Sequence, residues 1–204
     1  MADKEGSGLL SEEQGQALVR LARKTIMEKL KLPLMPPAEA PLADYWQAPV
    51  FQEKRGVFVT LHRAGLLRGC IGSLTGAPPI IEGVRDNAIN AAFNDCRFSL
   101  VTAEEFAEID VEVSILSKPQ PLSYDGADDL LAGLRPGIDG VIIKKGRVSA
   151  TFLPQVWKQL PETEGFLAHL CQKAGLPADE WRRGELEVIT YQVQCFAEEG
   201  RVSA

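Results

Sequence analysis

Two apolar segments joined by a short turn place the strongest constraint on the fold of this chain. Residues 57–61 form an apolar, partly β-branched run, and residues 67–73 follow it after a turn around Ala64 and Gly65. Such a pair predicts a β-hairpin. An antiparallel pair of strands is therefore the framework that the other segments have to extend or cover.

The second strand of this hairpin contains the sequence LRGCIG at residues 67–72. Because side chains alternate between the two faces of a strand, Arg68 and Cys70 are expected on one face. Gly69 and Gly72 weaken a strand, which suggests that another backbone or a ligand comes close to it. The Arg68 guanidinium would favour the thiolate of a partly solvated Cys70. This strand is the candidate site, and a packed, unreactive thiol is the alternative.

The remaining segments predict helices and strands that do not alternate regularly. The expected helices lie at 11–30 (behind a capping box that starts at Ser11), 78–94, 102–105, 125–134, 153–157, 162–174 and 179–183. The expected strands lie at 110–116, at 141–143 and 148–152 as a second hairpin, and at 186–196 as one final strand. Residues 32–49 contain five prolines and predict an extended connection.

This order of elements predicts an α+β fold with a mainly antiparallel sheet flanked by helices. The final strand is expected to return to the same sheet, so a smaller second lobe would be an insertion. We expect one domain with two lobes at 11–196, a flexible tail at 1–10 and a second tail at 197–204.

Composition excludes several classes of function. The formal charge is −6 and the pI is near 5.1, so we expect no nucleic-acid partner. The basic residues Lys144, Lys145 and Arg147 are expected at a solvated hairpin tip. No apolar stretch has membrane-spanning length and no signal peptide is evident, which predicts a cytoplasmic protein. Four cysteines without CxxC spacing and only two histidines predict no disulfide framework, no metal site and no cofactor.

The segment LRGCIG resembles the signature of the AMMECR family, called protein A of the AmmeMemoRadiSam system in bacteria. Other segments resemble further family blocks in the expected order: NAAFNDCRFSL at 90–100, VEVSIL at 111–116, GIDGV at 137–141, ATFLPQV at 150–156, residues 173–176 with Trp181, and residues 191–196. The resemblance covers roughly residues 11–196. Family members often carry proline at the place of Cys96 and histidine at the place of Asp139.

The resemblance implies a two-lobed α+β fold in which LRGCIG lines a cleft between the lobes. It also implies association with a Memo-type protein and a radical-SAM protein. It implies no particular reaction.

The preferred interpretation is a protein that binds a small molecule or a segment of a partner protein. Arg68 and Arg97 could bind an anionic group through their guanidinium groups, but Arg97 could equally be an ion-pair partner of Asp95, which is the commoner situation. The expected ligand-binding residues are Gly69, Ile71, Gly72, Asp95, Arg97, Thr151 and Gln155.

The second interpretation is a thiol-dependent enzyme with Cys70 as its nucleophile. Arg68 would lower the pKa of the thiol or bind an anionic substrate group, and the acid, base or orienter would be Asp95, Arg97, Glu112 or Asp139. His62 is the nearest imidazole in sequence. A two-residue turn at 64–65 would pair Val59 with Cys70 and place His62 on the opposite face, whereas one extra residue would reverse this. Both registers stay open. A third interpretation, a metal held by Cys70, Asp139 and Glu112, has the weakest support.

Overall fold

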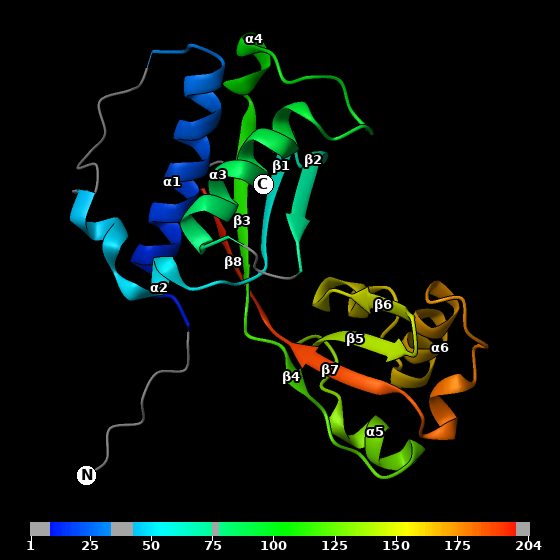
Figure 1. Cartoon of the computed structure of the whole chain (residues 1–204). Helices are drawn as coiled ribbons and strands as arrows, with labels where there is room; N and C mark the ends of the chain where they lie inside the picture. The colour runs from blue at the N-terminus through cyan, green and yellow to red at the C-terminus, as the bar shows by residue number, and fades with distance from the viewer. Residues whose placement is uncertain (1–8, 34–42, 75–77, 199–204) are drawn as a thin grey trace, which may run out of the picture. The chain divides into compact units, whose positions relative to one another are not determined.

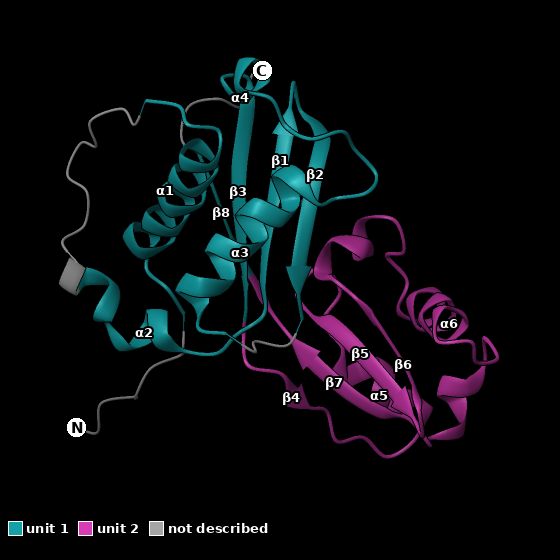
Figure 2. Ribbon diagram, turned by 45° about the horizontal axis from the view of Figure 1, so that its top comes forward, with its two compact units in different colours: residues 1–116, 194–204 teal, residues 117–193 magenta. Residues whose placement is uncertain are grey.

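The computed structural model describes residues 9–33, 43–74 and 78–198 (Figure 1). The chain forms two compact units, drawn in different colours in Figure 2. Unit 1 consists of Met1–Leu116 and Gln194–Ala204, and unit 2 consists of Ser117–Val193. Unit 2 is therefore an insertion between two strands of unit 1, as the sequence predicts. The predicted α+β fold is confirmed, with two four-stranded sheets.

Unit 1 is a sheet with its two long helices on one face. Its elements are α1 (Glu12–Lys29), η1 (Ala43–Gln47), α2 (Pro49–Gln52), β1 (Val57–Arg63), β2 (Leu66–Ser73), α3 (Ile80–Phe93), α4 (Ala103–Phe106), β3 (Ile109–Leu116) and β8 (Val193–Ala197). The strand order is β2-β1-β3-β8, and β1 is antiparallel to both β2 and β3. Helices α1 and α3 pack side by side on the sheet (Figure 1).

Local sequence explains why these helices begin and pack where they do. Ser11 caps α1 through the predicted box, because its hydroxyl accepts from Gln14 N while the Gln14 side chain accepts from Ser11 N. The apolar side chains of both helices are buried against the inward-facing side chains of the strands. In β1 these are Val57, Val59 and Leu61, so the side chains between them lie on the other face of the sheet.

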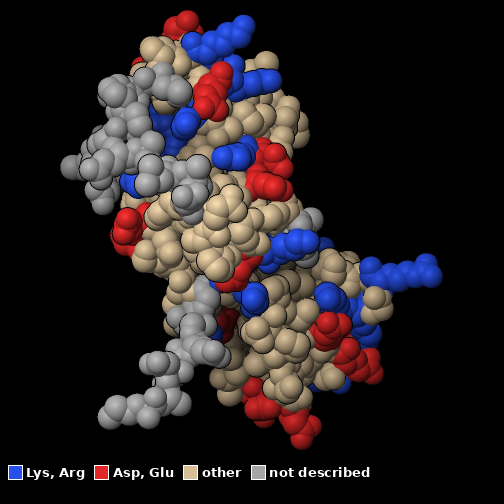
Figure 3. Space-filling view, turned by 60° about the vertical axis from the view of Figure 1, so that its left-hand side comes forward, with Lys and Arg blue, Asp and Glu red and all other residues tan. Residues whose placement is uncertain are grey.

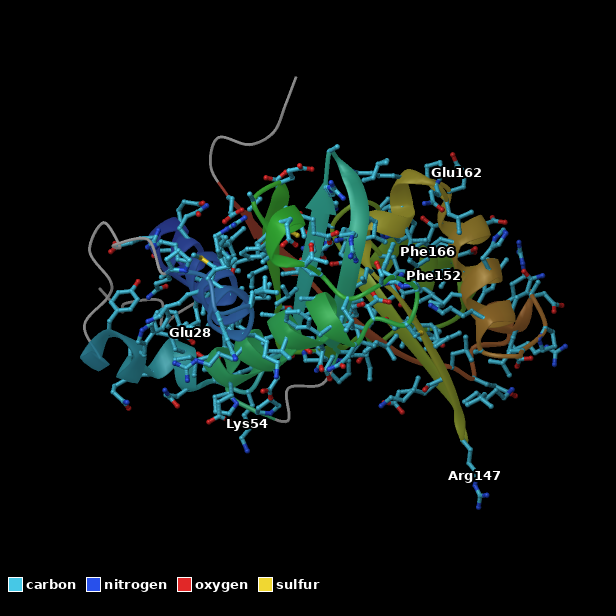
Figure 4. The ribbon with its side chains drawn as sticks, turned by 90° about the horizontal axis from the view of Figure 1, so that it is seen from above. Glu28, Lys54, Arg147, Phe152, Glu162 and Phe166 are labelled. Carbon is cyan, nitrogen blue, oxygen red and sulfur yellow. The ribbon has the colours of Figure 1, made fainter. Side chains whose placement is uncertain are left out.

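Unit 2 is a second sheet with its own core. Its elements are β4 (Gln120–Pro121), α5 (Ala127–Gly133), β5 (Gly140–Lys145), β6 (Val148–Phe152), η2 (Pro154–Lys158), α6 (Thr163–Lys173), η3 (Glu180–Arg183) and β7 (Glu187–Tyr191). The strand order is β4-β7-β5-β6, with antiparallel pairings. The Trp157 and Phe166 rings stack at 3.7 Å between centroids, and Phe152 meets Phe166 edge-on at 5.3 Å (Figure 4).

Three predicted elements differ from the observed ones. The final strand at 186–196 is divided at Gln192 into β7 and β8, because each half pairs with a different sheet. Gln192 exchanges hydrogen bonds with Ser117 where the chain enters and leaves unit 2. The segment at 153–157 is a 3-10 helix, and the end of the proline-rich connection holds η1 and α2 instead of extended chain.

Some predictions lie outside the described residues. They concern residues 1–8 of the first tail, residues 199–204 of the second, and residues 34–42 of the proline-rich connection. Within the described ranges, no helix combines the length and apolar character needed to cross a membrane.

Charged side chains of both signs are interspersed on the face shown in Figure 3. The predicted basic cluster of Lys144, Lys145 and Arg147 also has carboxylates beside it. Lys144 pairs with Glu187, and Lys145 lies between Glu180 and Glu185. Arg147 projects from the tip of the β5–β6 hairpin (Figure 4). Most of this cluster is therefore neutralised within unit 2 by paired carboxylates.

Candidate functional site

The LRGCIG segment lies in β2, the edge strand of the unit 1 sheet. The turn before it has two central residues, Ala64 and Gly65, with φ of 51° and 75°. Positive φ at both positions is typical of the type I′ hairpin turn, so of the two turn lengths that the sequence left open the two-residue turn is observed. The register beyond the turn nevertheless differs from the one that a regular ladder would give.

A β-bulge moves Cys70 by one position relative to β1. His62 pairs with Leu67 and Leu61 pairs with Gly69, which leaves Arg68 as the extra residue on β2. Cys70 is consequently opposite Thr60 and not opposite Val59. Because directly opposed side chains share a face, Cys70 lies on the same face as Thr60 and His62. The bulge thus decides between the two registers that the sequence left open.

The pairing of β1 with β3 adds a carboxylate, so that a thiol, a hydroxyl and a carboxylate form a row across three strands. Thr60 is opposite Cys70 on one side and opposite Glu112 on the other. His62 and Asp110 are opposed in the neighbouring position of β1 and β3. These side chains all lie on the face of the sheet that α1 and α3 do not cover. We call the row Cys70–Thr60–Glu112 the thiol row.

The Cys70 thiol is half-buried and has a hydroxyl neighbour. Thr60 Oγ1 donates a hydrogen bond to Cys70 Sγ over 3.3 Å. Within the described part of the chain this is the hydrogen bond that the sulfur makes, and His62 shares the face without bonding to it. A hydroxyl donor stabilises negative charge on sulfur, but it cannot remove the thiol proton as a base would.

Glu112 and Asp110 are half-buried carboxylates on this face. In the ranges that the structure describes, neither side chain makes a hydrogen bond or an ion pair. The deeply buried carboxylates elsewhere are paired: Asp95 with Arg97, Asp139 with Arg135 and Glu180 with Lys145. Buried charge is costly unless it is compensated, so the thiol row presents an acidic group with free acceptor capacity.

Arg68 is occupied by contacts beside the row. One nitrogen of its guanidinium lies 2.7 Å from Glu105 Oε1 and 3.4 Å from Ser99 Oγ, and the side chain is 12% exposed. The guanidinium also lies over the Phe98 ring. Arg68 is the extra residue of the bulge, so the regular alternation of side chains between the two faces is interrupted there. The prediction that Arg68 and Cys70 share a face because they are two residues apart therefore does not apply. Its charge is shared with Glu105 instead of acting on the thiol alone.

The small and apolar residues of the segment have packing partners inside unit 1. A Cβ on Gly69 would lie 2.3 Å from the carbonyl oxygen of Ala91 in α3. A Cβ on Gly72 would lie 2.2 Å from the Phe58 ring on the neighbouring strand. Ile71 packs against the core of the unit. The expected close approach at Gly69 is therefore that of the α3 backbone.

Asp95 and Arg97 hold the backbone of Cys70 at the sheet edge. Asp95 Oδ2 accepts from Cys70 N over 2.9 Å, and Arg97 Nη2 donates to Cys70 O over 3.0 Å. The two side chains also form a two-point ion pair, with Nε–Oδ1 at 2.9 Å and Nη2–Oδ2 at 2.7 Å. We call this arrangement the edge clamp. Hydrogen bonds from Arg97 lower the pKa of Asp95 well below its ordinary value, despite its burial.

The lowered pKa of Asp95 predicts how stability depends on pH. A depressed folded-state pKa contributes stability above the ordinary pKa, and this contribution is lost as the pH falls through the folded value. We expect Asp95→Asn to lower the free energy of unfolding by about 2 kcal/mol near neutral pH, and this difference to shrink below about pH 4. Urea unfolding followed by Trp46 fluorescence, from neutral to acid pH, measures it. A difference that stays constant into the acid range would contradict the assignment.

The other expected site residues, Asp139, Thr151 and Gln155, belong to unit 2. Asp139 is 2% exposed and accepts hydrogen bonds from the backbone and guanidinium of Arg135. Thr151 Oγ1 lies 3.0 Å from the Tyr191 hydroxyl, whose pKa is raised by burial. Gln155 is exposed in η2. Asp139 and Thr151 therefore make structural contacts inside their own unit.

The structure adds Thr60 and Asp110 to the residues that the sequence singled out. The alternation in β3 was a usable signal for Asp110, because it places Asp110 and Glu112 on one face. Thr60 could not be assigned to Cys70 without the bulge. The four cysteines are free, and the described ranges contain no group of three His, Cys, Asp or Glu side chains able to hold a metal ion.

Similar proteins match this chain over nearly its whole length. The AMMECR1 family model matches residues 19–196. A protein of Methanothermobacter thermautotrophicus is 41% identical over 194 residues, covering 94% of this chain and 97% of that protein. Protein MJ0810 of Methanocaldococcus jannaschii is 39% identical over 193 residues, covering 93% and 92%.

A solved structure is similar as well. The crystal structure of an uncharacterised protein from Pyrococcus horikoshii aligns with a TM-score of 0.74 at 38% identity, covering 93% of this chain and 94% of that one. None of these similarities assigns a reaction.

Proposed function

This chain belongs to the AMMECR1 family, and we propose that it binds a small molecule or a segment of a partner protein at residues 67–72. The binding surface is the face of the unit 1 sheet that carries the thiol row. The protein acts in the cytoplasm within a modification system that includes a Memo-type protein and a radical-SAM protein. The family resemblance supports this association, and the geometry supports the binding surface.

The observation that carries the proposal is the thiol row itself. A half-buried thiol, a hydroxyl and a carboxylate are opposed across three strands, and the carboxylate makes no hydrogen bond or ion pair in the described ranges. A half-buried carboxylate one position beyond the hydroxyl that contacts the sulfur can accept a hydrogen bond from a ligand donor. The row has no base in contact with the sulfur, which favours binding over catalysis.

Two single substitutions test whether ligand capture uses the row. We expect Glu112→Gln and Cys70→Ser each to weaken capture by about tenfold, the effect of one hydrogen bond to a charged group. Capture is measured by biolayer interferometry against purified Memo-type and radical-SAM proteins, and by thermal shift against a metabolite library. Glu108→Gln and Cys96→Ser are matched controls, because both residues are exposed outside the row. Equal capture by row and control variants, or no capture at all, would refute the proposal.

A thiol-dependent enzyme is the second candidate, and the hydrogen bond from Thr60 to the sulfur favours it. The two candidates differ in the rate at which iodoacetamide alkylates Cys70 near neutral pH. Binding predicts that Cys70 reacts more slowly than the exposed Cys96, whereas an activated nucleophile would react faster. Peptide mass spectrometry resolves the two sites. In the enzyme, Thr60→Val should slow the reaction of Cys70 and leave that of Cys96 unchanged.

A further inference from the structure

β2 is an edge strand of the unit 1 sheet, so the N–H and C=O groups on its outer side have no neighbouring strand among the described residues to pair with. Edge strands present unpaired N–H and C=O groups, and proteins cover or pair them. At Cys70 both groups are taken by side chains, the N–H by Asp95 and the C=O by Arg97. The edge clamp therefore stands where the next strand would stand.

The geometry of the clamp is fixed by the four hydrogen bonds that the Asp95 carboxylate accepts. Asp95 accepts from Cys70 N, and from the backbone N, Nε and Nη2 of Arg97. The Asp95 side chain is 3% exposed, while Arg97 is 52% exposed. Charge-assisted, two-point pairs of this kind fix orientation as well as distance. A small rotation of β2 at Cys70 would break the hydrogen bonds of both its N–H and its C=O group.

We propose that Asp95 and Arg97 are positioning residues for Cys70. They act through its backbone, and they hold β2 in the register that keeps the thiol beside Thr60, on the face of the sheet opposite α1 and α3. A ligand then meets the thiol from the face of the sheet, because the clamp occupies the edge of β2 at Cys70. The functional importance of this role rests on the proposed binding function, although the clamp itself can be measured without any ligand.

Hydrogen exchange at single amides tests the clamp. In Asp95→Ala we expect the Cys70 amide to exchange at least about tenfold faster, since its acceptor is gone. Arg97→Gln should give a smaller increase, because Asp95 still accepts from Cys70. Arg97→Lys should restore part of the protection by keeping a cation beside Asp95. The amides of Phe58 and Thr60 serve as internal references in β1, because their backbone groups face β3 and not β2.

A merely structural role would give a different pattern. General destabilisation raises exchange in Cys70, Phe58 and Thr60 together, and Arg97→Lys would not rescue Cys70 selectively. Arg63→Gln, which removes a surface ion pair in the same hairpin, is the matched control and should leave Cys70 protected. Unchanged exchange at Cys70 in Asp95→Ala, or an equal increase at all three amides, overturns the proposal.

The iodoacetamide reaction of Cys70 provides a second readout. If the clamp holds the thiol in its half-buried position, Asp95→Ala should alkylate severalfold faster at Cys70 and at the wild-type rate at Cys195. An unchanged rate at Cys70 overturns the positioning role. Failure of Cys70→Ser to alter ligand capture would instead remove the binding function and leave the clamp intact, so the two failures are distinguishable.

Discussion

Gly69→Ala is expected to destabilise unit 1 by about 3 kcal/mol, at the upper end of the usual cost of overpacking. The new methyl group would lie 2.3 Å from the Ala91 carbonyl oxygen, which is backbone of α3 and cannot rotate away as a flexible side chain could. Either α3 moves off the sheet or β2 shifts at its edge. Both movements disturb buried contacts between helix and strand.

Urea unfolding followed by Trp46 fluorescence measures this loss in unit 1. Gly65→Ala is the matched control in the same hairpin, because a Cβ there has open space and meets only the cost of a positive φ. That cost is about 1 kcal/mol. If the two variants were equally stable, the close approach of α3 to β2 would not be the reason for glycine at position 69.

The hairpin shows which part of the site could be predicted from the sequence. Alternation and turn chemistry act over a few residues, so the strands, the turn at 64–65 and the candidate strand were all predictable. The bulge at Arg68 was not, because no local pattern marks it and the observed contacts of Arg68 are with Glu105 and Ser99, which are distant in sequence. One inserted residue decides which partner Cys70 has, so local rules could not identify Thr60.

The final strand and the edge clamp also depend on contacts between residues far apart in the sequence, which local patterns do not reveal. The segment 186–196 has one continuous strand pattern, yet its two halves join different sheets, and only the pairing partners reveal the division at Gln192. Asp95 and Arg97 were predicted from the sequence as ligand-binding residues. Their bonds to the backbone of Cys70 join segments 25 or more residues apart, so sequence could suggest the residues and not their role.

Asp139→Ala is expected to lower the stability of unit 2 by about 3 kcal/mol, since hydrogen bonds to a charged group contribute about 1.5–3 kcal/mol. The carboxylate accepts from Arg135 N and Nε over 3.0 Å each, and from Arg135 Nη2 over 2.6 Å. The Asp139 carbonyl also accepts from Trp157 Nε1 over 2.7 Å, next to the stacked Phe166 ring. Loss of the carboxylate therefore loosens the turn that anchors a core tryptophan.

Urea unfolding monitored by tryptophan fluorescence measures this change, with Trp157 and Trp181 reporting on unit 2. Asp139→Asn keeps one acceptor and should lose about half as much stability, because the charge is gone but a hydrogen bond can remain. Glu187→Ala removes an exposed ion pair with Lys144 and should cost less than about 1 kcal/mol. A catalytic Asp139 would behave differently: the Asn variant would fold with wild-type stability and fail only in turnover.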